Sequence, residues 1–243
     1  MSMRSKSQQL AIYFVEVETV AAVLDDAEMR TPRLSPDQIQ RHRQKASIDL
    51  TEADHWRRTH IALRIALERF AGSGVRGIAF DIAPGGRPCL PANADLIKRP
   101  HFSLAHAGQY ALIAISNAGR IGIDLEVTRT LNVTTERRHR IEAAARYLAP
   151  DANLPETPDA RFLQAWVRLE AVAKASGLGI GRILTEAGVI GGASHTLSPA
   201  SSTVRDLSLP SGCYAAIAGD ELPAILTVED FPTDKAGIAG FLH

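Results

Sequence analysis

The stretch of sequence that most restricts the fold is residues 121–127, Ile-Gly-Ile-Asp-Leu-Glu-Val, in which two acidic residues alternate with apolar ones. Successive side chains of a β-strand point to opposite faces, so Asp124 and Glu126 are expected to project from the same face. Two carboxylates on one strand face repel each other unless a cation lies between them. A divalent metal removes this repulsion, and oxygen ligands are typical of magnesium. The segment therefore predicts a strand whose acidic face could hold a magnesium ion.

A simpler interpretation of an isolated Asp-x-Glu is an edge strand with a charged, solvated outer face. Three neighbours favour a site instead. Gly122 would let another backbone approach the strand closely. Glu170 lies in an otherwise apolar helical stretch, where a carboxylate is rarely buried without a partner, and Lys174 follows it by one helical turn. An exposed Glu170–Lys174 pair would contribute only ~0.3–0.5 kcal/mol, and a salt bridge and a metal site do not exclude each other.

Composition excludes several classes of protein. The 243 residues suffice for one large or two small domains, and 45% are apolar, so a sizeable core can form without disulfides. Acidic and basic residues balance at 27 each, which argues against a nucleic-acid-binding protein. Cys89 and Cys213 are expected to be free thiols of a reduced, cytoplasmic protein. No apolar run approaches the ~20 residues that span a bilayer, and residues 1–9 lack the apolar core of a secretory signal, so no membrane association is expected.

Periodicity predicts helices and strands along the first half of the chain. Residues 11–17 are β-branched and aromatic, which is typical of a strand, and Ser35 is a typical helix N-cap. Residues 52–70 repeat apolar side chains at helical spacing, and Gly72 is expected to end that helix. Residues 84–88 are rich in glycine and proline and predict a loop.

The second half is predicted to contain a similar mixture. Residues 110–116 and 121–127 are expected to pair as a hairpin. The other expected elements are a helix from Thr134 or Thr135 to Leu148, a loop at 155–158, a helix capped by Asp159 and ending at Gly177, short strands and loops at 188–211, and a strand at 213–218. Residues 109–115 resemble 212–218, which suggests two similar halves with a boundary near 116–121, although any two apolar strands look alike.

Three further residues are candidates for contacts to phosphate. Arg87 lies in a Gly-Gly-Arg-Pro loop, where backbone N–H groups and a guanidinium fork suit phosphate oxygens, although a solvated turn is the simpler interpretation. Arg41 could lie on an exposed helix face or clamp a phosphate. His106 ends a strand-like segment, where a single histidine is more often a satisfied polar group than a catalytic one.

These motifs occur in an order that resembles the 4′-phosphopantetheinyl transferases of the Sfp type. The order is Gly-Arg-Pro at 86–88, Phe-x-x-x-His at 102–106, Gly-Ile-Asp-Leu-Glu at 122–126 and Trp-x-x-x-Glu-Ala-x-x-Lys at 166–174. The resemblance runs from about Ser35 to Gly179, and the last two motifs are fairly specific as a pair. It implies an α+β fold of two similar halves related by pseudo-two-fold symmetry, residues 1–118 and 119–243, each a small antiparallel sheet with packed helices.

The resemblance also implies roles for the acidic residues and the helix lysine. Asp124, Glu126 and Glu170 match the family's magnesium-binding carboxylates, which places the metal site in the second half. Lys174 matches its helix lysine near the pyrophosphate. Asp124, Glu170 and Lys174 are therefore expected to be catalytic, and either Glu170 or a metal-bound water would take the proton from the acceptor hydroxyl.

Coenzyme A, by the same resemblance, lies in the cleft between the halves. His106 matches the histidine that contacts a phosphate of coenzyme A, close to Lys174. Arg87 and Pro88 match the Gly-Lys-Pro loop beside the adenine. Arg41 falls where the family often places a basic residue for the 3′-phosphate.

The sequence departs from the family pattern at three places. The usual Asn-x-Ser-His-Ser is Ser-Leu-Ala-His-Ala at 103–107, so Ala105 replaces a phosphate-binding serine. The usual lysine before the helix glutamate is Leu169, with Arg168 one place earlier, and Arg87 stands for lysine. These changes concern phosphate affinity and leave the three carboxylates in place.

The implied function is the transfer of the 4′-phosphopantetheine arm from coenzyme A to a serine of an apo acyl or peptidyl carrier protein, which releases adenosine 3′,5′-bisphosphate. The expected partners are coenzyme A, magnesium and the carrier protein, and the chain is expected to act as a monomer. The alternative is a non-catalytic module of the same fold that binds coenzyme A or a carrier protein. A third interpretation is an α+β protein whose carboxylates are surface charges.

Overall fold

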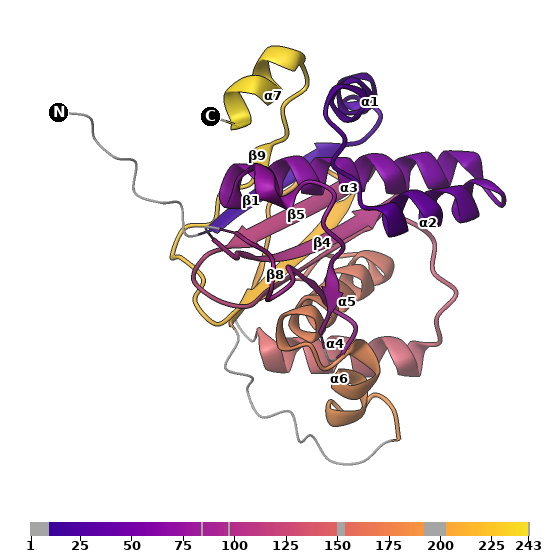
Figure 1. Ribbon diagram of the computed structural model, residues 1–243. Helices are drawn as coiled ribbons and strands as arrows, with labels where there is room; N and C mark the ends of the chain where they lie inside the picture. The colour runs from indigo at the N-terminus through magenta and orange to yellow at the C-terminus, as the bar shows by residue number, and fades with distance from the viewer. Residues whose placement is uncertain (1–9, 84, 97, 150–153, 192–202, 243) are drawn as a thin grey trace.

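The computed structural model describes residues 10–83, 85–96, 98–149, 154–191 and 203–242 (Figure 1). The helices are α1 Ala21–Arg30, α2 Pro36–Ala46, α3 Leu50–Ala71, α4 Thr135–Leu148, α5 Pro158–Ser176, α6 Ile180–Glu186 and α7 Lys235–Leu242, with a 3₁₀ turn at Ser73–Val75. The strands are β1 Leu10–Glu16, β2 Asp81–Ile82, β3 Pro88–Cys89, β4 His101–Ala107, β5 Tyr110–Ser116, β6 Ile121–Val127, β7 Thr203–Asp206, β8 Cys213–Gly219 and β9 Glu229–Asp230. The predictions for residues 1–9, for Pro84 and for 192–202 lie outside the described residues.

The first sheet has the strand order β4-β5-β1-β9 and is covered on one face by α3. Strands β4 and β1 both pair antiparallel with β5, and the short β9 adds a parallel edge to β1. Helix α3 spans 22 residues; the Asp49 side chain caps its start by accepting the N–H of Glu52 at 3.0 Å, and Gly72, at a φ of +82°, ends it. The predicted helix and its glycine stop are therefore confirmed.

The second sheet is antiparallel, has the strand order β6-β8-β7, and is covered by α5. The N-cap of α5 is Thr157, whose side chain accepts the N–H of Ala160, so the prediction that Asp159 caps this helix is wrong. Pro158 occupies the first helical position, which moves the cap one residue earlier. Asp159 instead lies in the first turn, 2.6 Å from Arg138 of α4.

The predicted hairpin between β5 and β6 is also wrong. Strand β5 has β1 on one edge and β4 on the other, so it has no free edge for β6. The hairpin partner of β5 is β4, through a tight turn at Gly108 with a φ of +57°. Strand β6 crosses to the second sheet, where it pairs with β8.

The layers follow from the alternation of side chains along single strands. In β1, Tyr13 and Val15 pack with α3, whereas Ile12 and Phe14 belong to a cluster that includes Ile123 of β6. The order is therefore helix, sheet, sheet, helix: Figure 1 shows α1–α3 and α7 above the strands and α4–α6 below them. The expected α+β class with small, mostly antiparallel sheets is confirmed.

The last described segment returns to the first sheet. After β8 the chain forms β9 beside β1 and then α7, and Phe231, Ile238 and Phe241 join the core between α3 and the first sheet. The ring of Phe241 lies 5.0 Å from that of Tyr13 on β1. No helix of the described residues is long and apolar enough to cross a membrane.

Candidate functional site

A polar pocket of about 460 Å³ opens where β6, α5, the end of β4 and the start of α3 meet. Its charged lining consists of Glu52, His106, Asp124, Glu126, Arg129, Glu170 and Lys174. Five of these seven are residues that the sequence singled out. The pocket thus collects both acidic motifs and the histidine from three elements, β4, β6 and α5.

The close packing of β6 on α5 brings the two acidic motifs together. A side chain at Gly122 would place its Cβ 2.1 Å from the carbonyl oxygen of Ala171 on α5, so only glycine allows this approach. The expected role of Gly122 is confirmed. Both Asp124 and Glu126 line the pocket, as two residues on the same face of β6 should.

Lys174 forms its ion pair with Asp124 of β6 and not with Glu170, one helical turn before it. Its Nζ atom lies 2.7 Å from Oδ1 of Asp124, and it also donates to the backbone carbonyl oxygens of Ile123 at 3.0 Å and Leu104 at 3.5 Å. The i,i+4 pairing with Glu170 was the other possibility raised by the sequence. The lysine therefore lies between β4, β6 and α5 and joins the two sheets at the floor of the pocket.

The pocket carries more negative charge than its cations neutralise. Burial raises the pKa of Asp124, Lys174 opposes that rise, and Glu126 adds to it. Burial also raises the pKa of Glu170, and the nearby charge of Asp124 raises it further. Two carboxylates that both hold protons more tightly than usual mark a site where a cation would be stabilised.

The carboxylate oxygens of the pocket suit a magnesium ion, although these side chains are not arranged around a common point. Among the described residues, no group of three or more His, Cys, Asp or Glu side chains is arranged so that it could hold a metal. Lys174 pairs with Asp124, and the Nη2 atom of Arg129 lies 3.1 Å from Oε1 of Glu126. Three of the four carboxylates that line the pocket, those of Asp124, Glu126 and Glu170, nevertheless form an oxygen-only set of the kind that magnesium prefers. The residues present therefore fit the ion chemically.

A second pocket, of about 370 Å³, adjoins the first and shares Glu170 and Lys174 with it. Its walls are the loop at residues 85–88, residues 102–104 of β4 and one face of α5. Arg87 and Pro88 therefore lie where the same helix face presents Glu170 and Lys174. The wall at β4 is fixed to β6 because Oγ of Ser103 accepts the N–H of Ile123 at 3.0 Å.

Arg41 and His106 lie on different elements, α2 and β4, but the charges of both affect one partly buried histidine, His60 on α3. Burial and the charges of His106, Arg64 and Arg41 together lower the pKa of His60 to about 4. Its Nδ1 atom lies 2.8 Å from the carbonyl oxygen of Trp56. The sequence used His60 only as a position in a helical repeat, so this basic neighbourhood was missed.

Two of the positions that depart from the family pattern, Ala105 and Leu169, line neither pocket. Ala105 is 5% exposed and packs in the apolar cluster between the sheets. Leu169 and Arg168 are both 0% exposed, and Arg168 forms a two-pronged pair with Asp206 of β7, with N–O distances of 2.8 and 2.6 Å. Ala105 and Leu169 carry no charge, and Arg168 is paired with Asp206, so none of the three supplies a cation to the pocket.

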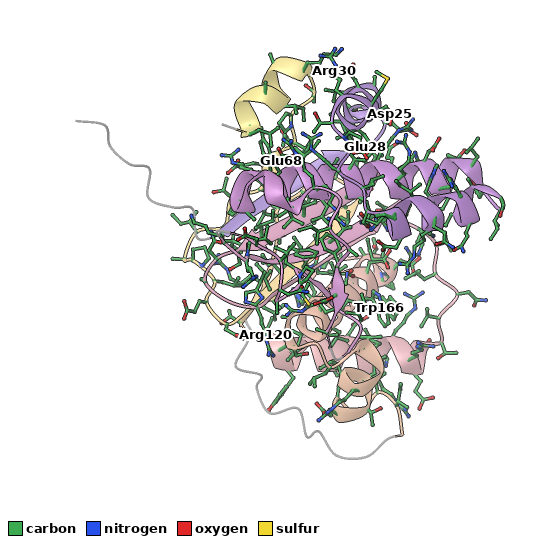
Figure 2. The ribbon with its side chains drawn as sticks, viewed as in Figure 1. Asp25, Glu28, Arg30, Glu68, Arg120 and Trp166 are labelled. Carbon is green, nitrogen blue, oxygen red and sulfur yellow. The ribbon has the colours of Figure 1, made fainter. Side chains whose placement is uncertain are left out.

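Three residues of the pocket had no role in the sequence interpretation. Arg129 pairs with Glu126 three residues earlier, a spacing that could have indicated it. Glu52 comes from the first turn of α3, and its position depends on a fold contact that no local signal encodes. Trp166, labelled on α5 in Figure 2, was part of a motif but was given no function.

Comparison with curated proteins identifies relatives with a common name, whereas no protein-family model matches. The putative 4′-phosphopantetheinyl transferase slr0495 of Synechocystis is 34% identical over 127 residues, which is 49% of this chain and 48% of that protein. The 4′-phosphopantetheinyl transferase AcpT of Salmonella typhimurium is 29% identical over 92 residues, 38% of this chain and 46% of that protein. The AcpT of Salmonella typhi is 28% identical over the same length. The chain thus spans about half the length of the curated relatives it matches, and over that part it is related to proteins named 4′-phosphopantetheinyl transferase.

Proposed function

We propose that this protein is an Sfp-type 4′-phosphopantetheinyl transferase. It transfers the phosphopantetheine arm of coenzyme A to a serine of an apo acyl or peptidyl carrier protein and releases adenosine 3′,5′-bisphosphate. The observation that carries the proposal is the shared wall of two pockets: Glu170 and Lys174 border both the acidic pocket and the pocket of Arg87. A donor with a pyrophosphate could thus reach both from one position.

Asp124, Glu126 and Glu170 are the residues that would hold magnesium. When bound, the ion supplies positive charge that offsets the charge developing on the leaving phosphate. Lys174 is one donor to the same phosphates, since its ammonium group already lies at the floor of the acidic pocket. Phosphoryl transfer needs such positioning and charge neutralisation more than covalent catalysis.

Glu170 is our candidate for the base that takes the proton from the acceptor serine. Its pKa is raised by burial and by Asp124, so once ionised it binds a proton more tightly than an ordinary glutamate. It is half-buried at the boundary of the two pockets, where donor and acceptor would meet.

The basic residues are assigned to coenzyme A. Arg87 and Pro88 would lie beside the adenine, His106 would contact a phosphate together with Lys174, and Arg41 would bind the 3′-phosphate. The carrier protein would approach the open side of the acidic pocket. We further propose that the protein is a cytoplasmic monomer. We also propose that it consists of two pseudosymmetric halves, residues 1–118 and 119–243, because each sheet is covered by one long helix, α3 or α5.

Mass spectrometry of an apo carrier protein incubated with coenzyme A, magnesium and this protein tests the proposal. A gain of one phosphopantetheine mass on the carrier serine is expected, and none is expected without magnesium. The assay should cover acyl and peptidyl carriers of several pathways. Unmodified carrier proteins throughout would contradict an enzymatic role.

The second candidate is a non-catalytic module that binds coenzyme A or a carrier protein. It is favoured by one observation: Ala105 and Leu169, which replace a phosphate-binding serine and a lysine of the family pattern, are buried in apolar clusters. Such a module would gain thermal stability from coenzyme A and magnesium by mass action without modifying the carrier.

A further inference from the structure

The loop that carries Arg87 is the tip of a hairpin too small to hold its own shape. Strands β2 and β3 contribute two residues each, paired as Asp81 with Cys89 and Ile82 with Pro88. The tip adds hydrogen bonds from the N–H of Ala83 to the carbonyl oxygen of Arg87 at 2.9 Å and from that of Gly86 to Ala83 at 3.0 Å. An isolated two-stranded hairpin is marginally stable in water, so this one depends on what it packs against.

One residue of the loop touches the backbone at the end of α5. A Cβ atom on Gly85 would lie 1.5 Å from the carbonyl oxygen of Gly177 and 2.5 Å from its carbonyl carbon. Gly177 is the left-handed C-cap of α5, with a φ of +71°. The neighbouring Gly86 has almost the same φ as Gly85, +85° against +88°, yet a Cβ there would meet nothing within 4 Å. Contact with α5 therefore distinguishes two glycines that are otherwise alike.

This contact lies at the end of the helix face that forms the shared wall. Glu170, Ala173, Lys174 and Gly177 follow the i, i+3, i+4, i+7 spacing of one helical stripe, and all four line the 370 Å³ pocket. Arg87 lines the same pocket two residues after Gly85. The distance from Arg87 to Lys174 is thus set by where the loop rests on Gly177.

The surroundings of Arg87 favour the binding of an anion. Arg87 is half-buried, and no carboxylate of the described residues forms an ion pair with it. Burial lowers the pKa of its guanidinium, and the positive charge of Arg120 lowers it further. A guanidinium near another cation and without a carboxylate is stabilised when an anionic ligand arrives.

We propose that Gly85 is a positioning residue for the donor substrate: its backbone contact with Gly177 docks the loop on α5 and holds Arg87 at a fixed distance from Lys174. The anionic ligand is named through the proposed function and is coenzyme A. Gly85 touches no reacting atom. Its effect should therefore appear in the binding of coenzyme A and act through Arg87.

Calorimetric titration of coenzyme A, in the presence of magnesium, into five forms of the full chain tests this inference: wild type, G85A, G86A, R87A and the double variant G85A/R87A. Both alanine substitutions add backbone strain at a positive φ, but only G85A collides with α5. We expect G85A and R87A each to weaken binding about tenfold to a hundredfold, as for loss of a charge-assisted hydrogen bond. The double variant should bind no more weakly than R87A, and G86A, which lines the same pocket but does not meet α5, should weaken binding less than G85A.

Kinetics and amide exchange separate positioning from a general loss of structure. In steady-state assays G85A should raise KM for coenzyme A with little change in kcat, because Asp124, Glu170 and Lys174 are untouched. Exchange at the amide of Ala83 should be faster in G85A than in G86A, while the melting temperatures of the two variants agree.

Two results would overturn the inference: equal affinity of G85A and G86A for coenzyme A, or losses from G85A and R87A that add in the double variant. If wild type does not bind coenzyme A, the proposed function and the ligand named here both fail. The exchange measurement then still decides on docking, since equal rates in G85A and G86A would show that the loop does not depend on α5.

Discussion

At the scale of single residues, Asp124 is a side chain whose environment opposes its charge. It is 8% exposed, and burial together with Glu126 raises its pKa despite the pairing with Lys174. A carboxyl group with a higher pKa in the folded than in the unfolded state lowers stability above that pKa, and this penalty disappears as the pH falls through it. The charge of Asp124 is therefore maintained for a reason other than stability.

We predict that Asp124→Asn abolishes transfer while the melting temperature without magnesium at pH 7 stays equal or rises. The difference in melting temperature between variant and wild type should shrink as the pH is lowered, because wild-type Asp124 then becomes protonated. Holo-carrier formation and thermal unfolding at pH 7 and 5 provide the two readouts. A clearly lower melting temperature for the variant at pH 7 would mean that Asp124 serves mainly to hold Lys174.

Arg41 supports a second prediction at this scale. Replacing Arg41 by alanine should weaken the binding of coenzyme A about ten- to a hundredfold and the binding of 3′-dephospho-coenzyme A much less, since the 3′-phosphate is the proposed partner of Arg41. Arg43, two residues along the same helix and also exposed, is the matched control, and R43A should affect the binding of both ligands alike. Calorimetric titration of both ligands tests this prediction. If R41A loses the same affinity for both ligands, Arg41 does not contact the 3′-phosphate.

At the scale of elements, the sequence predicted what local patterns encode. The alternation in β6 and the helical repeat of α3 are confirmed, as are the caps at Ser35 and Thr134. The pairing of β5 was predicted wrongly because strand partners depend on which edges are free, and β1 had already taken one. The Lys174–Asp124 pair was missed for a related reason, since it depends on how closely β6 packs on α5.

Helix α3 contains a titrating group that should make stability depend on pH. His60 is partly buried, and burial and nearby positive charges lower its pKa to about 4 from an ordinary value of 6.5, so between these values the unfolded chain binds a proton that the folded protein does not. Stability is then fully present above pH 6.5 and falls as the pH decreases toward 4, by roughly 3 kcal/mol at most. The charged groups that act on His60 are His106, Arg64 and Arg41, and all of them disfavour its protonation.

Urea unfolding between pH 7 and 4.5 should show this loss in wild type and a shallower one in His60→Gln. Replacing His139, which is exposed on α4, by glutamine is the control and should leave the wild-type slope unchanged. If His60→Gln and wild type lose stability in parallel over this range, the histidine is not the titrating group.

At the scale of the whole molecule, the first and last described elements, β1 and α7, contribute to one core. Residues 229–242 follow the second sheet in sequence but pack in space against α3 and β1, and the two sheets share an apolar cluster. Local patterns could not predict this return, because β9 has two residues and α7 has eight. The tip of α7 is held by aromatic contacts: Phe241 lies 5.0 Å from Tyr13 and 5.4 Å from Phe231, between ring centroids.

We predict that Phe241→Ala destabilises the protein by about 3 kcal/mol, through lost burial and the cavity left between α7 and α3. Because the aromatic cluster closes the first core and the sheets pack on each other, the variant should still unfold in a single transition of the whole chain, at a lower midpoint than wild type.

Ile225→Ala, at a side chain that is 82% exposed, is the control and should change stability by less than about 0.5 kcal/mol. Chemical denaturation followed by tryptophan fluorescence and by circular dichroism measures both variants, since Trp56 lies on α3 and Trp166 on α5. Two separated transitions in Phe241→Ala, with α5 unfolding at its wild-type midpoint, would show instead that the helix–sheet pairs are stable independently of each other.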